Sequence, residues 1–87
     1  MYYVYLLTCA DNTLYCGITT DVDRRVKEHN SSKLGAKYTK PRRPVELSYV
    51  IEAKNKSEAS KLEYKIKQLS RKEKLELIKT QDKLLNC

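Results

Sequence analysis

The sequence predicts an α+β fold, in which a small three-stranded antiparallel sheet (an N-terminal hairpin plus one later strand) is flanked by about three helices. Two short runs rich in aromatic and β-branched residues, 2–8 and 14–18, flank a turn-forming Asp-Asn pair. A third run, 45–51, alternates in polarity, and apolar residues recur at helical spacing in three other segments. No repeat or long linker divides the chain, so we expect one domain over 1–80 and a frayed tail at 81–87.

The length of the hairpin loop decides which side chains share a face of the sheet. A two-residue turn at 11–12 would place Tyr5 and Tyr15 on opposite faces. A three-residue loop at 10–12 would place them on the same face, and this is the arrangement that we predict. Gly17 then lies on the face of Tyr15 and leaves bare backbone where a ligand could approach closely.

The first helix is predicted from Thr20 to near Asn30, because Thr20 and Asp23 resemble a capping box and two valines follow at helical spacing. Arg25 and His29 are four residues apart and therefore adjacent on its surface. Arginine binds phosphate through a planar fork and histidine titrates near neutrality, so this pair suits a phosphodiester. The same spacing is also common on basic helices that bind no ligand.

Residues 31–44 contain both prolines and are predicted to form a loop. The candidate nucleic-acid contacts in this loop are Lys33, Lys37, Tyr38, Lys40, Arg42 and Arg43. The cations would contact backbone phosphates, and the tyrosine ring would stack on a base. A charged loop that faces only solvent is the alternative.

The third strand and two further helices complete the predicted fold. One face of the strand is expected to carry Val45, Leu47, Tyr49 and Ile51. Ser57 is predicted to cap the second helix, whose apolar positions are Ala59, Leu62, Ile66 and Leu69. Ser70 and Glu73 form a capping box that begins the third helix, with Leu75 and Ile78 facing inward.

Glu63 falls on or beside the apolar stripe of the second helix, although acidic side chains are rarely buried without a partner. A carboxylate in this position could hold a divalent cation, since Mg²⁺ is typically bound by one or two carboxylates together with waters and substrate phosphates. A salt bridge to Arg25 or to a nearby lysine would explain its position equally well.

The composition indicates a polyanionic partner. Eighteen Lys and Arg against eleven Asp and Glu give a net charge of +7 and a pI near 9.4, as expected for a protein that binds nucleic acid. No apolar run is long enough to span a bilayer, and no signal peptide is visible, so we expect no membrane partner. Three cysteines without ligand spacing argue against a zinc site or a disulfide framework and favour a cytoplasmic location.

Four motifs, "VYL", "YCG", "RRVKEHN" and "LEYKIKQLS", follow one another over residues 2 to about 79. In their order and spacing the chain resembles the GIY-YIG endonuclease superfamily, in particular its small stand-alone bacterial members. The catalytic residues implied by this resemblance are Tyr5, Tyr15, Arg25, His29 and Glu63, with Gly17 as the glycine of the second motif. It also implies one divalent ion, Mg²⁺ or Mn²⁺, on Glu63. The chain departs from the motif names at Tyr3, which replaces a glycine, and at Cys16, which replaces an isoleucine.

The resemblance implies a metal-dependent endonuclease that hydrolyses a phosphodiester bond in nucleic acid, with a role in DNA repair or processing. We expect the substrate to be DNA, structured or single-stranded, rather than RNA. Tyr5, coupled to His29, would take a proton from the attacking water, and Arg25 would hold the scissile phosphate. Tyr15 would hydrogen-bond the water or the phosphate, and the metal on Glu63 would stabilise the leaving oxygen. The division of roles between the two tyrosines and the oligomeric state stay open. A nucleic-acid-binding module of the same fold with little cleavage is the alternative.

Overall fold

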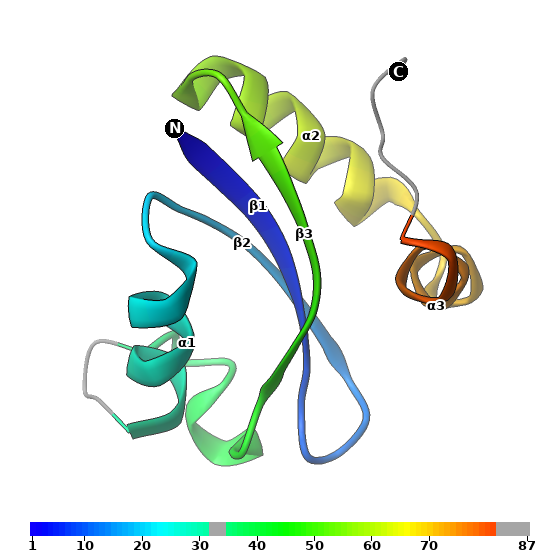
Figure 1. The fold of residues 1–87 in the computed structure, drawn as a ribbon. Coiled ribbons are helices and arrows are strands. Elements are labelled where there is room, and N and C mark those ends of the chain that lie inside the picture. Colours follow the sequence, from blue (N-terminus) through cyan, green and yellow to red (C-terminus); the bar gives the residue numbers. More distant parts are fainter. Residues whose placement is uncertain (32–34, 82–87) are drawn as a thin grey trace.

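The computed structural model describes residues 1–31 and 35–81 and confirms the α+β fold (Figure 1). The strands are β1 (Tyr2–Thr8), β2 (Leu14–Thr19) and β3 (Glu46–Ala53). The helices are α1 (Val22–Ser31), α2 (Lys56–Gln68) and α3 (Arg71–Thr80), and a short 3-10 helix, η1 (Lys40–Arg42), precedes β3. The sheet is antiparallel with the strand order β2-β1-β3, so β1 is its central strand.

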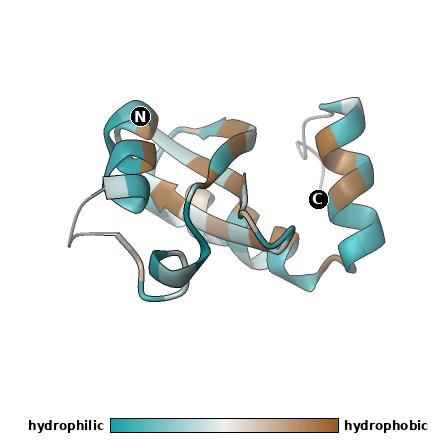
Figure 2. Ribbon diagram, turned by 90° about the horizontal axis from the view of Figure 1, so that it is seen from below, coloured by the Kyte–Doolittle hydropathy of each residue, from teal (hydrophilic) through white to brown (hydrophobic). Residues whose placement is uncertain are grey.

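The two faces of the sheet carry different layers. Helices α2 and α3 lie on one side, and α1 with the segment around η1 lies on the other (Figure 1). The buried core on the α2 side consists of Val4, Leu6, Tyr49, Ile51, Ala53, Ala59, Ile66 and Leu77. The smaller cluster on the α1 side consists of Tyr5, Leu7, Cys9 and Val45, with Tyr15 and Val26 packed against it. Figure 2 shows the apolar bands on the strands and the mostly hydrophilic helices. Helix α1 therefore covers the face that carries Tyr5.

The hairpin has the predicted loop of odd length. The residues on either side of the loop 10–12 are joined by a backbone hydrogen bond of 2.9 Å. Asn12 in this loop has a φ of 66°, a left-handed conformation that asparagine tolerates better than most residues. Tyr5 pairs with Gly17 across the two strands. Because residues two apart on a strand share a face, Tyr15 lies on the same face as Tyr5, as predicted.

A bulge in β3 overturns part of the predicted face assignment. Leu6 pairs with Tyr49 whereas Leu7 pairs with Leu47, so Ser48 has no backbone pairing partner on β1, although its hydroxyl lies 2.6 Å from that of Thr8. The extra residue moves Leu47 onto the α1 face, where it is 41% exposed, while Tyr49 stays buried on the α2 face. The prediction that Val45, Leu47, Tyr49 and Ile51 share one face is therefore wrong, because a bulge exchanges the faces to which the side chains beyond it point.

The helix starts are partly as predicted. Helix α1 is capped by Asp21 and not by Thr20, since the Asp21 carboxylate accepts the backbone N–H three residues on at 3.1 Å. Asn55, and not Ser57, is the N-cap of α2. Aspartate and asparagine cap helices as well as serine does, so neighbouring candidates compete. The capping box at Ser70 that begins α3 is confirmed.

The chain after α3 begins with an anchored residue. Gln81 is the C-cap of α3 in a left-handed conformation, and its Nε2 donates to the Ser48 carbonyl at 3.0 Å. The rest of the predicted frayed tail, 82–87, lies outside the described residues. Within the described part of the chain, no helix is long and apolar enough to cross a membrane.

Candidate active site

A chain of buried hydrogen bonds joins β1, α1 and the loop before η1. Tyr5 Oη lies 2.9 Å from His29 Nε2, and His29 Nδ1 lies 2.8 Å from Thr39 Oγ1. The Thr39 hydroxyl also contacts the Ala36 carbonyl oxygen at 3.0 Å. Tyr5 is 1% exposed, and His29 and Thr39 are 0% exposed. The packing of α1 on the sheet thus places His29 directly against Tyr5 of the central strand.

Arg25 lies one helical turn before His29 and adds a cation to this cluster. Its guanidinium donates to the Tyr5 hydroxyl and, at 2.9 Å, to Glu28 Oε1. The Arg25 side chain is 25% exposed, whereas Tyr5 is buried. Arg25 is therefore the member of the cluster that a ligand can reach from solvent.

Aromatic side chains form one wall of the cluster. The Tyr15 ring centroid lies 6.5 Å from that of Tyr5 and 5.2 Å from that of His29. Tyr38 stacks on Tyr15 at 5.9 Å, and the Arg42 guanidinium lies 4.0 Å from the Tyr38 ring centroid. Tyr15 is half-buried, so both tyrosines named by the motif belong to one site but differ in accessibility.

Both arginines of the predicted basic loop have structural partners. Arg43 donates from Nε to the His29 carbonyl and from Nη2 to the Glu28 carbonyl at 3.3 Å, so it caps the end of α1. Arg42 forms an ion pair of 3.0 Å with Asp11 of the hairpin loop. These bonds give the Arg43 guanidinium a structural role at the end of α1, and its contact with phosphate stays a prediction.

The lysines of this loop are differently placed. Lys37 and Lys40 are exposed, which leaves them accessible to phosphate. Tyr38 is 38% exposed, but its ring packs against neighbours and is not a free stacking platform. Lys33 lies outside the described residues.

Glu63 extends from α2, the helix on the opposite face of the sheet from the Tyr5 cluster. Its carboxylate forms an ion pair of 3.5 Å with Lys67, and its side chain is 26% exposed. Of the two partners considered from the sequence, the nearby lysine is the one observed. Burial, and then the negative charge of Glu63, raise the pKa of the Cys16 thiol on β2 to about 12, which places Glu63 beside that edge strand. Within residues 1–31 and 35–81, no three His, Cys, Asp or Glu side chains gather as a metal cluster.

The buried pair of Tyr5 and His29 is neutral at neutral pH. Burial raises the pKa of Tyr5 to about 12, although the hydrogen bond from Arg25 opposes the shift. Burial lowers the pKa of His29 to about 4, and the positive charge of Arg25 adds to this effect. Tyr5 is therefore a phenol and His29 an uncharged imidazole, whose lone pair can accept the Tyr5 hydroxyl although burial disfavours the protonated ring.

The low pKa of His29 predicts a loss of stability in mild acid. The unfolded chain protonates this imidazole near pH 6.5 and the folded chain only near pH 4, so stability falls as the pH falls through this range. The shift corresponds to roughly 3 kcal/mol. Urea denaturation at several pH values should show this loss in the wild type and a smaller one in His29→Gln. An equal pH dependence in both proteins would assign the loss to other groups.

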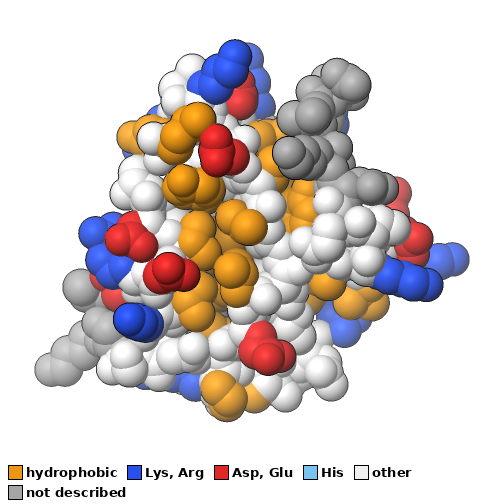
Figure 3. Space-filling model, viewed as in Figure 1, with side chains coloured by type: hydrophobic (Ala, Val, Ile, Leu, Met, Phe, Trp, Pro, Cys, Tyr) orange, Lys and Arg blue, Asp and Glu red, His pale blue; other side chains and the backbone are white. Residues whose placement is uncertain are grey.

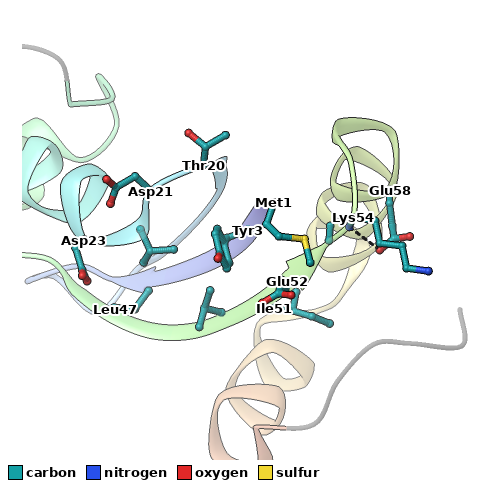
Figure 4. A pocket seen from close by; sticks show the side chains of 13 residues that line it. Met1, Tyr3, Thr20, Asp21, Asp23, Leu47, Ile51, Glu52, Lys54 and Glu58 are labelled. Carbon is teal, nitrogen blue, oxygen red and sulfur yellow. Dashed lines mark hydrogen bonds between the residues drawn. The ribbon is translucent and has the colours of Figure 1, made fainter.

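An open groove of about 830 Å³ lies elsewhere, between the start of α1 and the edge strand β3 (Figure 4). Its floor includes the exposed Leu47 and Val50, and the hydrophobic side chains on this side of the molecule lie among carboxylates (Figure 3). The charged residues that line it are Asp21, Asp23, Lys54, Glu52 and Glu58. Because carboxylates repel phosphate, the charge of this groove disfavours nucleic acid there.

Comparison with known proteins agrees with the motifs. The family model described as the GIY-YIG catalytic domain matches residues 1–76. The chain belongs to the GIY-YIG family. Its relatives include UPF0213 protein DP2720 of Desulfotalea psychrophila, 55% identical over 82 residues that cover 94% of this chain and 74% of the relative. UPF0213 protein VNG_2274C of Halobacterium salinarum is 54% identical over 74 residues, which cover 85% and 95% of the two chains.

Two solution NMR structures resemble this GIY-YIG domain. The UPF0213 protein BH0048 of Bacillus halodurans is 47% identical with a TM-score of 0.58, and the match covers 92% of this chain and 85% of that chain. Protein EF2693 of E. faecalis is 43% identical with a TM-score of 0.62, and the match covers 91% and 83%. GIY-YIG domains are generally endonucleases that act on nucleic acid with a divalent metal, but the names of these relatives state no activity.

The glycine of the second GIY-YIG motif has a packing role in this chain. Gly17 is buried beneath the Tyr5 ring, so the space that we predicted for a ligand is filled by that ring. A Cβ at this position would lie 2.5 Å from Tyr5 Oη and 2.7 Å from Cζ. The glycine therefore makes room for the buried tyrosine of the first motif, Tyr5.

Gly17→Ala is expected to destabilise the domain by about 1 to 3 kcal/mol, because the new Cβ would overlap the buried ring of Tyr5. Urea denaturation of the single variant, of Tyr5→Ala and of the double variant measures this effect. Gly17→Ala should lower the free energy of unfolding much less in the Tyr5→Ala background, where the ring is absent, than in the wild type. An equal loss of unfolding free energy in the wild type and in Tyr5→Ala would show that the alanine does not act by colliding with the ring.

Two residues of the site were missed in the sequence. Asn30 accepts the Val45 N–H at 2.7 Å and donates to the Val45 carbonyl at 3.0 Å, so it joins the end of α1 to the start of β3. Thr39 contacts His29 from the loop. A lone asparagine at a helix end or a threonine in a loop resembles an ordinary cap, so no local signal distinguishes either one.

Proposed function

We propose that this protein is a metal-dependent endonuclease that hydrolyses a phosphodiester bond in DNA, structured or single-stranded, rather than in RNA, and that it acts in DNA repair or processing. The observation that supports this most directly is the cluster of Arg25, Tyr5 and His29. It combines a partly exposed cation, a phenol and a neutral imidazole in continuous hydrogen-bonding contact. These are a phosphate-binding group and a proton-accepting pair, the two functions that hydrolysis of a phosphodiester requires.

Arg25 also controls access to Tyr5 in this proposal. In the free protein the guanidinium is hydrogen-bonded to the Tyr5 oxygen and to Glu28. A substrate phosphate competes for the same donors, and a guanidinium that turns toward it leaves a lone pair of Tyr5 free for the attacking water. The phosphate also offsets the positive charge of Arg25, which is one cause of the low pKa of His29. Binding therefore strengthens the base where it is needed.

The proton transfers balance as follows. The attacking water gives a proton to Tyr5 Oη while the Tyr5 hydroxyl gives its own proton to His29 Nε2. The water oxygen bonds to phosphorus, and the bond to the leaving oxygen breaks. The leaving oxygen keeps the electron pair and takes a proton from solvent, so the products are a phosphate monoester and a hydroxyl group. His29 then returns its proton to Tyr5 while Tyr5 releases a proton to solvent, which replaces the one taken by the leaving oxygen. Tyr15, half-buried beside them, orients the water or the phosphate by hydrogen bonding.

Glu63 would hold the divalent ion, Mg²⁺ or Mn²⁺. Its carboxylate is 26% exposed and its ion pair with Lys67 is exposed, so an ion can reach it. One protein carboxylate suits Mg²⁺, which keeps several waters and takes further oxygens from substrate phosphate. Because α2 and the Tyr5 cluster lie on opposite faces of the sheet, an ion bound there would act on a substrate phosphate only at the β2 edge, beside Cys16, where it would stabilise negative charge on the leaving oxygen.

The exposed cations near the site would hold the nucleic-acid backbone. Lys37 and Lys40 lie in the loop before β3, and Arg24 on α1 has a side chain that is 60% exposed. Contacts of this type recognise phosphate and not base sequence, so we expect binding by backbone and shape. Each phosphate contact that is removed should lower, by about one unit, the slope of the logarithm of the binding constant against the logarithm of the salt concentration.

A nucleic-acid-binding module without cleavage is the second candidate, and the burial of Tyr5 favours it. A general base must reach the water that it deprotonates, but Tyr5 is only 1% exposed in this conformation. In this reading Tyr5 and His29 support the fold, and Arg25 with the exposed lysines binds phosphate.

Cleavage of labelled single-stranded, flapped, branched and duplex DNA and of RNA, with Mg²⁺, Mn²⁺ or EDTA, separates the two candidates. The endonuclease predicts metal-dependent products that Tyr5→Phe abolishes while binding is retained, because the variant keeps the ring and loses only the hydroxyl. Binding to the panel with no products in either metal would overturn the endonuclease and support the module. The absence of both binding and products would overturn both.

A further inference from the structure

Thr39 is a buried polar residue whose hydroxyl does not make the contact expected at its position. It is the N-cap of η1, where a threonine hydroxyl usually accepts a backbone N–H, yet its side chain makes no capping bond. The hydroxyl instead contacts His29 Nδ1 at 2.8 Å and the Ala36 carbonyl oxygen at 3.0 Å. The residue is 0% exposed, so water does not compete for these bonds.

Counting protons along this chain of hydrogen bonds determines the direction of each bond. A carbonyl oxygen only accepts, so the one hydroxyl proton of Thr39 points to Ala36. The Thr39 oxygen must then accept from His29, which requires a proton on Nδ1. A neutral imidazole carries one N–H, so Nε2 is bare and accepts the proton of the Tyr5 hydroxyl at 2.9 Å.

We propose that Thr39 is a positioning residue that holds His29 in the Nδ1–H tautomer, so that Nε2 presents its lone pair to the Tyr5 hydroxyl. The opposite tautomer would place two lone pairs against each other at Nδ1, or would force the Thr39 proton away from Ala36. It would also place an N–H against the Tyr5 proton. The tautomer itself follows from the hydrogen bonds, and only its catalytic consequence rests on the proposed function.

This arrangement serves both states of the imidazole. When Nε2 receives the proton of Tyr5, Nδ1 keeps its own proton and continues to donate to Thr39. The proton transfer therefore needs no rotation of the ring and no exchange of hydrogen bonds. The other groups that face the ring or act on its charge are Tyr15 from β2, Arg25 and Glu28 from α1, and Arg43 from the loop before β3. Thr39 is the residue that is hydrogen-bonded to Nδ1, at 2.8 Å, so it is the group that we infer to select the tautomer.

Nitrogen-15 NMR of the ring tests the proposal directly, since His29 is the one histidine of the sequence. In a neutral ring the bare nitrogen resonates far downfield of the protonated nitrogen, and long-range coupling to the ring protons tells Nδ1 from Nε2. We expect a protonated Nδ1 and a bare Nε2 in the wild type and in Thr39→Ser, which keeps the hydroxyl. In Thr39→Val, which is similar in shape but has no hydroxyl, we expect a mixture of tautomers or the opposite one. Thr20→Val, at an exposed site, is the matched control and should not change the spectrum.

A wild-type spectrum with the proton on Nε2 overturns the proposal, and this measurement needs no variant that might fail to fold. A wild-type tautomer in folded Thr39→Val also overturns it. In the cleavage assay, Thr39→Val should lower kcat by about 10- to 100-fold with little change in KM, and Thr39→Ser should restore most of it. A changed tautomer with unchanged kcat overturns the positioning role. The predicted tautomer in a protein that cleaves no substrate supports the tautomer assignment and overturns the endonuclease.

Discussion

Arg25→Lys is expected to lower the cleavage rate by about 10²- to 10³-fold while the protein remains folded. The guanidinium presents a planar set of donors that can bridge two phosphate oxygens, whereas an ammonium is a point charge and cannot reproduce this geometry. Lysine also loses the fixed donor to the Tyr5 hydroxyl, through which Arg25 adjusts the buried pair. The rate should be measured at saturating substrate, so that the loss is assigned to the chemical step and not to weaker binding.

Arg24→Lys is the matched control for this variant. Arg24 is the neighbouring residue on α1, its side chain is 60% exposed, and its ion pair with Glu28 is longer, at 3.8 Å. Arg24→Lys should lower the cleavage rate by at most a few-fold. Because Arg25 is only partly buried, both variants should unfold at nearly the same urea concentration as the wild type. A rate for Arg25→Lys within about fivefold of that for Arg24→Lys would remove Arg25 from the chemical step.

The parts of the fold that follow from local periodicity could be predicted from the sequence. The two hairpin strands, the three helices and the capping box at Ser70 depend on residues close together in the chain. The shared face of Tyr5 and Tyr15 also follows from local geometry, because the parity of a short loop fixes the register. The bulge at Ser48 could not be predicted, since it depends on how β3 pairs with a strand forty residues away.

The site was predictable where a residue type has one evident chemical use and not where its use depends on distant neighbours. Arg25 and His29 are adjacent because of helical spacing, and the motif placed Tyr5 nearby. Arg43 is as basic as the loop lysines, yet it holds carbonyls at the end of α1, a contact that exists only once the loop returns to the helix. Thr39 contacts His29 for the same reason. The family motif therefore points to the groups that we propose to be catalytic, and the structure adds the residues that contact them.

Glu63→Gln is expected to lower metal-dependent cleavage by about 10²-fold or more and to leave stability almost unchanged. The variant has the same shape but lacks the charge that a divalent ion requires. The ion pair that it breaks, with Lys67, is a partly exposed pair four residues apart on α2, worth only about 0.3 to 0.5 kcal/mol. Titration with Mg²⁺ and Mn²⁺ should show that higher metal concentrations restore part of the rate. Glu76→Gln, at an exposed position on α3, is the control.

A second readout of Glu63→Gln is independent of activity. The charge of Glu63 is one of the causes of the raised pKa of the Cys16 thiol, after burial, so the thiol pKa should fall in this variant. The pH dependence of alkylation at Cys16, followed by mass spectrometry, measures this change. Loss of cleavage together with a lowered thiol pKa would join Glu63 to the catalytic cluster across the β2 edge of the sheet. Full cleavage together with a lowered thiol pKa would show that Glu63 lies where the structure places it but holds no catalytic metal, and would confine the catalytic groups to the α1 face.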